Sequence, residues 1–102
     1  MAQEQGLDDR IALTAEKIRA GKTSLGIEFG STRIKAVLID DTYTTIAAGD
    51  YGWASHLEDG LWSYSQEEIW TGLQTAYAAL AEDVENAYGE KLTRVGRIGF
   101  SA

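Results

Sequence analysis

The chain has 102 residues, enough for one domain with a thin hydrophobic core. Its net charge of −7 comes from 16 acidic and 9 basic residues, and an acidic surface disfavours nucleic acid and anionic membranes as partners. Cysteine is absent, which excludes disulfides and thiolate metal sites, and we expect a reducing, cytoplasmic location. No signal peptide is predicted, and no apolar run approaches the roughly 20 residues that span a bilayer.

The N-terminal residues 8–20 are predicted to form a helix. Ile11, Ala15 and Ile18 recur at helical spacing, and Gly21 follows as a stop signal. Both a helix packed on the domain and an extension from it fit this pattern. We assign residues 1–22 to an N-terminal helical extension and residues 23–102 to a partial N-terminal domain.

Three strands are predicted next, over residues 23–29, 32–40 and 43–51. Apolar residues occupy both faces of the second strand, which predicts a central strand covered from both sides. The links between the three strands are short, so they are predicted to form an antiparallel meander.

A long helix is the clearest element of the second half, after a predicted loop over residues 52–65. Ser65 and Glu68 form a capping box at its start, and Gly89 ends it. Between them runs an apolar stripe at helical spacing: Ile69, Leu73, Tyr77, Leu80, Val84 and Tyr88. Residues 94–101 are predicted to form a fourth strand, and the helical crossover makes it parallel to the first.

The turn between the first two strands carries the residues that suggest a function. Gly30 allows close approach of the backbone to an anion and dihedral angles closed to other residues. Ser31 and Thr32 add hydroxyl and amide donors, so the turn can form a nest for phosphate oxygens. Glu28 can hold the water ligands of Mg²⁺, and Lys35 can neutralise charge on a nucleotide.

A simpler interpretation explains the same residues and is favoured by the turn alone. Gly30, Ser31 and Thr32 are common in hairpin turns. Glu28 and Lys35 can form a cross-strand ion pair worth at most about 1 kcal/mol on a surface.

The order of the elements changes this balance, because three segments resemble the FGGY carbohydrate kinases. These belong to the superfamily of actin, heat-shock chaperones and sugar kinases. Residues 25–40 (LGIEFGSTRIKAVLID) resemble the family's first phosphate motif, a strand ending in Asp-x-Gly-Thr-Thr/Ser followed by a basic residue in the next strand. Residues 60–70 (GLWSYSQEEIW) resemble the start of its first long helix, and residues 97–101 (RIGFS) its fourth strand.

The resemblance implies an α/β fold of the ribonuclease H-like (actin-like ATPase) type. The expected sheet is mixed, with the order β-β-β-α-β, truncated and preceded by an N-terminal helix. The resemblance implies that Gly30, Ser31, Thr32 and Lys35 bind nucleotide phosphates, and that Glu28 contacts Mg²⁺ through water. The implied cofactors are ATP and Mg²⁺, and the implied substrate of the parent enzyme is a sugar or polyol.

The same resemblance implies that the chain by itself is inactive. The family's catalytic aspartate, second phosphate motif and adenosine motif lie further along the chain than residue 102, so no catalytic residue is assigned. The family also has aspartate at the position of Glu28, and the extra methylene displaces a hydrated ion. We expect the N-terminal part of an ATP-dependent sugar or polyol kinase.

Two alternatives stay open. A metal-dependent nuclease of the ribonuclease H-like fold needs several converging carboxylates, and Glu28 has no acidic counterpart in the fourth strand. The second alternative is a non-catalytic module that binds ATP or self-associates. A truncated sheet leaves its fourth strand as an exposed edge, so self-association is predicted.

Overall fold

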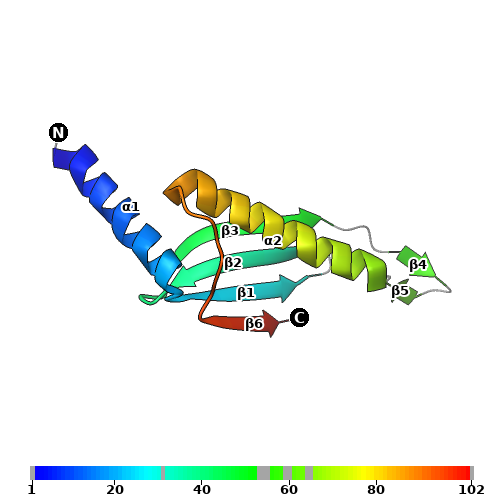
Figure 1. Cartoon of the computed structure of the whole chain (residues 1–102). Coiled ribbons are helices and arrows are strands. Elements are labelled where there is room, and N and C mark those ends of the chain that lie inside the picture. The colour runs from blue at the N-terminus through cyan, green and yellow to red at the C-terminus, as the bar shows by residue number, and fades with distance from the viewer. Residues whose placement is uncertain (1, 31, 53–55, 59–60, 64–65, 102) are drawn as a thin grey trace.

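The computed structural model describes residues 2–30, 32–52, 56–58, 61–63 and 66–101. In chain order they form α1 (Ala2–Ala20), β1 (Thr23–Phe29), β2 (Arg33–Asp40), β3 (Thr45–Gly52), β4 (His56–Glu58), β5 (Leu61–Ser63), α2 (Gln66–Tyr88) and β6 (Arg97–Ser101). The larger sheet has the strand order β3-β2-β1-β6. Helix α2 lies across one face of this sheet, and α1 projects from one end (Figure 1). No helix in the described ranges is long and apolar enough to cross a membrane.

The directions of the strands agree with the sequence prediction. β1 pairs antiparallel with β2, β2 pairs antiparallel with β3, and β6 is parallel to β1. The predicted meander and parallel fourth strand are therefore confirmed, as is the general α/β class with a mixed sheet. Helix α1 begins before residue 8, and β3 begins at Thr45 rather than at residue 43.

The prediction of a loop over residues 52–65 is wrong in part. β4 and β5 pair antiparallel as a small second sheet, with Leu57 opposite Trp62. The predicted cap Ser65 lies outside the described residues.

The hydrophobic core lies between α2 and the sheet. Alternate residues of the strands and one face of α2 are buried there, joined by one residue of α1: Leu25, Ile27, Ile34, Ala36, Leu38, Ala47, Ala76, Leu80, Val84 and Ile18. Gly49 of β3 sets how closely α2 approaches. A Cβ atom at Gly49 would lie 2.3 Å from the amide nitrogen of Leu80 and 2.6 Å from the carbonyl oxygen of Ala76.

Glycines end both helices, as predicted. Gly21 has a φ of 73°, and the amides of Gly21 and Lys22 donate to the carbonyls of Ile18 and Lys17, which closes a Schellman motif. Gly89 has a φ of 69° and donates to the carbonyl of Glu85.

The prediction that both faces of β2 are covered is wrong for the face opposite α2. Val37 and Ile39 point to the face opposite α2, and both are only half-buried. Of the described elements, both helices contact β2, and both contribute residues to the core on the α2 side of the sheet. We call the opposite side the open face.

Asp40, at the end of β2, organises the turn that leads to β3. Its Oδ1 accepts hydrogen bonds from the Thr42 amide (2.9 Å), the Thr42 hydroxyl (2.7 Å) and the Thr44 amide (3.0 Å). Its Oδ2 lies 3.5 Å from Lys17 Nζ of α1. Burial alone would raise the pKa of Asp40, but these hydrogen bonds and the charge of Lys17 lower it from 3.8 to about 2.

Asp40→Asn should reduce stability at neutral pH by about 2 kcal/mol, because the folded protein favours the ionised carboxylate. A depressed folded pKa contributes stability above the ordinary value of 3.8, and this stability is lost as the pH falls toward about 2. Urea unfolding at pH 7, 4 and 2.5 should show the wild type approaching the variant as the pH falls. Asp41→Asn, at a more exposed carboxylate that also contacts Lys17, is the control and should change less. An unchanged gap from pH 7 to 2.5 would contradict the assignment.

Gly49→Ala should destabilise the fold by about 2 kcal/mol, because the added methyl group meets the backbone of α2. Gly52→Ala in the same strand is the matched control, since a Cβ atom there would lie 4.0 Å from the nearest atom, the Thr32 carbonyl oxygen. Thermal and urea unfolding of both variants measure the difference. Equal stabilities would show that α2 can move away from β3 at little cost.

Candidate phosphate site at the β1–β2 turn

Two of the predicted site residues, Glu28 and Lys35, lie on the open face at the end of the central hairpin. Glu28 of β1 and Lys35 of β2 are directly opposite each other in the antiparallel register, and both side chains are exposed. Asp50 of β3 lies opposite Lys35, and Ser101 of β6 lies opposite Glu28. Asp50, Lys35, Glu28 and Ser101 therefore form one row across the sheet, and strand alternation places the row on the face away from α2.

A small hollow lies beside this row, with a volume of about 160 Å³. It is lined by Glu28, Gly30, Arg33 and Lys35. The structure thus brings together three of the predicted residues, Glu28, Gly30 and Lys35. Thr32 is exposed at the turn and does not line the hollow, and Ser31 lies outside the described residues.

Gly30 acts differently from the prediction. Its φ is not in the left-handed region, which among the described glycines is occupied by Gly21 and Gly89. The Gly30 amide donates to the Arg33 carbonyl at 2.8 Å, which closes the hairpin. A Cβ atom at Gly30 would lie 3.2 Å from that carbonyl oxygen. The tight turn, rather than an unusual dihedral angle, explains the glycine.

Arg33 is a site residue that the sequence prediction missed. Its Nη1 donates to Asp50 Oδ2 at 2.7 Å, and both side chains are more than half exposed. The available signal was its spacing, because Arg33 stands two residues before Lys35 and so shares its face. A surface ion pair is worth about 0–1 kcal/mol, so Arg33 can exchange Asp50 for a phosphate at small cost.

The charges that line the hollow and that of Asp50 beside it balance. Arg33 and Lys35 are cationic, and Glu28 and Asp50 are anionic. Lys35 lies between the two carboxylates in register, although no ion pair joins it to Glu28 in the described structure. The Glu28–Lys35 ion pair of the simpler interpretation is therefore not observed.

The side chains at the hollow fit a metal ion that is held mainly by a bound phosphate ligand and only in part by the protein. The described residues contain no group of three or more side chains that could hold a metal ion. Mg²⁺ commonly keeps several waters and uses one or two carboxylates together with substrate phosphates. Glu28 beside Arg33 and Lys35 fits a magnesium–phosphate complex, with the cations on the phosphates and the carboxylate toward the hydrated ion.

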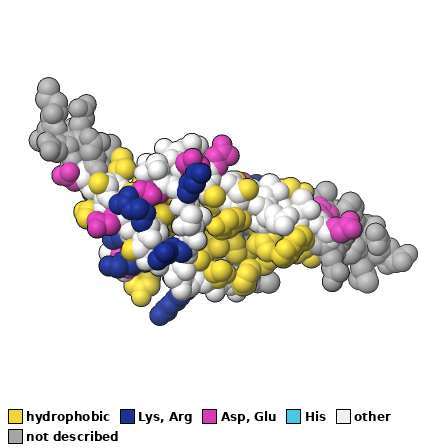
Figure 2. All heavy atoms as spheres, viewed as in Figure 1, with side chains coloured by type: hydrophobic (Ala, Val, Ile, Leu, Met, Phe, Trp, Pro, Cys, Tyr) yellow, Lys and Arg dark blue, Asp and Glu magenta, His cyan; other side chains and the backbone are white. Residues whose placement is uncertain are grey.

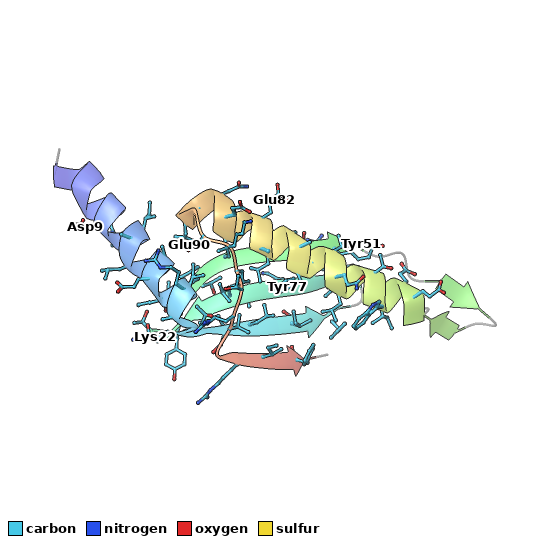
Figure 3. The ribbon with its side chains drawn as sticks, viewed as in Figure 1. Asp9, Lys22, Tyr51, Tyr77, Glu82 and Glu90 are labelled. Atoms are coloured by element: carbon cyan, nitrogen blue, oxygen red, sulfur yellow. The ribbon has the colours of Figure 1, made fainter. Side chains whose placement is uncertain are left out.

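A larger hollow lies elsewhere, and the predicted site residues do not line it. It is an apolar groove of about 460 Å³ between α2 and β6, lined by Leu25, Ile27, Leu73, Gln74, Tyr77, Thr93, Arg94, Val95, Ile98 and Phe100. Figure 2 shows hydrophobic side chains gathered along this strip, and Tyr77 is labelled on α2 in Figure 3. We call it the α2–β6 groove. Its lining suits apolar side chains rather than phosphates.

Comparison of the chain with protein-family models and with curated proteins finds no match. The resemblance to the FGGY kinases therefore stays a prediction, and functional inference depends on the geometry described above.

Proposed function

We propose that the chain binds the phosphates of magnesium–ATP at the β1–β2 turn, as the N-terminal part of an ATP-dependent sugar or polyol kinase. One observation carries the proposal. Glu28, Gly30, Arg33 and Lys35 line a single hollow at the end of the central hairpin. The strand order β3-β2-β1-β6 is compatible with the ribonuclease H-like arrangement that the sequence resemblance implies.

Each side chain has a distinct role in this proposal. The Lys35 ammonium and the Arg33 guanidinium donate to phosphate oxygens, with Arg33 leaving Asp50 to do so. The Thr32 hydroxyl, exposed at the turn, adds a donor. Glu28 would accept hydrogen bonds from the water ligands of Mg²⁺, and the ion, when bound, would neutralise phosphate charge.

The balanced charge of the hollow predicts which ligand binds best. A phosphate without metal meets the Glu28 carboxylate in the hollow and Asp50 beside it as well as two cations, so its net electrostatic gain is small. In the magnesium complex, Glu28 faces a cation and both basic side chains face phosphate oxygens. Magnesium–ATP should therefore bind more tightly than ATP alone or inorganic phosphate.

Binding is the extent of the activity proposed for this chain. The proposal assigns no catalytic base, and sugar phosphorylation by the chain alone is not expected. The nuclease alternative has less support, because the described residues lack the cluster of carboxylates that two metal ions require. A non-catalytic ATP-binding module would share the same phosphate site.

Titration of ¹⁵N-labelled protein with magnesium–ATP should shift the amide signals of residues 28–35. Lys35→Ala should weaken binding about tenfold, the effect of losing one charge-assisted hydrogen bond. Asp50→Asn should strengthen binding about two- to fivefold, because it releases Arg33 from its ion pair. This factor corresponds to the free energy of one surface ion pair. Lys22→Ala, an exposed lysine at the opposite end of β1, is the control and should change nothing.

Equal losses from Lys35→Ala and Lys22→Ala would mean that only net charge matters and would contradict a specific site. Signals that move around the α2–β6 groove instead would place the ligand elsewhere. Sugar phosphorylation by the chain alone would contradict the requirement for further catalytic motifs, and metal-dependent cleavage of RNA would favour the nuclease.

A further inference from the structure

The two edge strands of the main sheet, β3 and β6, differ in how well they are protected against pairing with another strand. At the β3 edge, side chains of α2 occupy backbone groups: Asp83 Oδ2 accepts from the Ala48 amide at 3.0 Å, and the Tyr88 hydroxyl donates to the Ile46 carbonyl at 2.9 Å. The pairing of β2 with β3 is also irregular at Leu38/Ile39. Occupied groups and bulges both hinder the addition of another strand. The β3 edge is therefore protected.

The β6 edge has no such protection in the described residues. β6 pairs with β1 on one side, and no described hydrogen bond reaches its outer side. Ile98 and Phe100 are 57% and 64% exposed on the side of the sheet that α2 occupies. Helix α2 contacts mainly β2 and β3 (Figure 1). The side chains of Ile98 and Phe100 therefore stay uncovered beside the α2–β6 groove. Stacking on Phe29, with ring centroids 6.2 Å apart, holds Phe100 in place.

We propose that a second copy of this chain pairs with β6 along this edge. The two β6 strands would run antiparallel about a two-fold axis perpendicular to the sheet at Gly99. Such an interface is isologous, so the same strand supplies both halves, and the two sheets become continuous. An antiparallel arrangement also keeps both α2 helices on the same side.

The apolar side chains match in this register. With Gly99 at the axis, Ile98 lies opposite Phe100 of the second copy, and the symmetric pair repeats the contact. Both pairs lie on the α2 side, where they close the outer rim of each groove. Gly99 itself presents no side chain on the open face, and a Cβ atom there has nothing within 4 Å. The two strands can therefore approach without obstruction.

The charges match as well, and this favours a second copy over an unrelated strand. In the same register Arg97 lies opposite Ser101 of the second copy, which is itself in register with Glu28 of that copy. Arg97 and that Glu28 would be two strand spacings apart, roughly 10 Å between Cα atoms. The small serine between them lets the two long side chains meet. The two-fold axis repeats the contact between Arg97 and Glu28 of the other copy. Arg97 belongs to a segment, residues 91–101, that has basic but no acidic residues.

Sedimentation of the wild type over a range of concentrations should show a reversible monomer–dimer equilibrium. Phe100→Lys should raise the dissociation constant at least tenfold. Leu13→Lys is the matched control, because Leu13 is 58% exposed on α1, away from β6, and should leave the equilibrium unchanged. Circular dichroism confirms that each variant is folded. A wild type that stays monomeric at millimolar concentration, or equal effects of the two variants, would overturn the proposal.

A charge exchange tests the register independently. Arg97→Glu and Glu28→Arg should each weaken the dimer, and the double variant should recover most of the lost affinity because the contact forms with reversed sign. No recovery would overturn the proposed register. These measurements use no nucleotide, so their failure leaves the phosphate site untouched.

Cross-linking tests the axis without altering charge. The chain has no cysteine, so Gly99→Cys introduces a single thiol at a position with room for it. Directly opposed residues of an antiparallel pair have Cα atoms about 4.5–5.5 Å apart, within the range of a disulfide. Mild oxidation should give a covalent dimer with Gly99→Cys but not with Thr71→Cys on exposed α2. Equal cross-linking of the two variants, or no cross-linking of Gly99→Cys, would overturn the two-fold axis at Gly99.

Discussion

The close contact of α2 with β3 is the constraint on which the rest of the arrangement depends. Gly49 lets the backbone of β3 approach Leu80 and Ala76 to a distance that no side chain would permit. A helix is only about 10 Å wide, so one drawn tightly onto β3 and β2 cannot also cover β6. Two features follow directly from this position, namely the α2–β6 groove and the exposed side chains of Ile98 and Phe100.

Strand alternation then separates the two kinds of chemistry. Leu25, Ile27, Ile34, Ala36 and Leu38 face α2 and form the buried apolar part of β1 and β2. The charged side chains of Glu28, Arg33 and Lys35 occupy alternate positions on the open face. Because those charges stay in water, their mutual interactions are weak, and none of them is committed to the stability of the core. Side chains with this freedom can change partners when a charged ligand arrives. The buried Asp40, with its dense set of hydrogen bonds, is the opposite case.

Most of the main sheet could be predicted from the sequence, because local patterns determine it. Alternation located the strands, Gly89 located the end of α2, and the crossover fixed the direction of β6. The β4–β5 hairpin was missed although Asp59-Gly60, a dipeptide typical of two-residue hairpin turns, separates its strands in the sequence. The Arg33–Asp50 contact and the uncovered face of β2 depend on register and helix placement, and no local pattern encodes either.

The two proposals meet at Glu28. In the proposed phosphate site this carboxylate would face the hydrated magnesium ion, and in the proposed paired sheet it would face Arg97 of the second copy. One carboxylate cannot serve both contacts fully, so magnesium–ATP and the second copy should each weaken the binding of the other. Such coupling is reciprocal, because both equilibria share one free-energy cycle. The row from Asp50 through Lys35 and Glu28 to Ser101 would then connect the candidate nucleotide site to the free edge of the sheet.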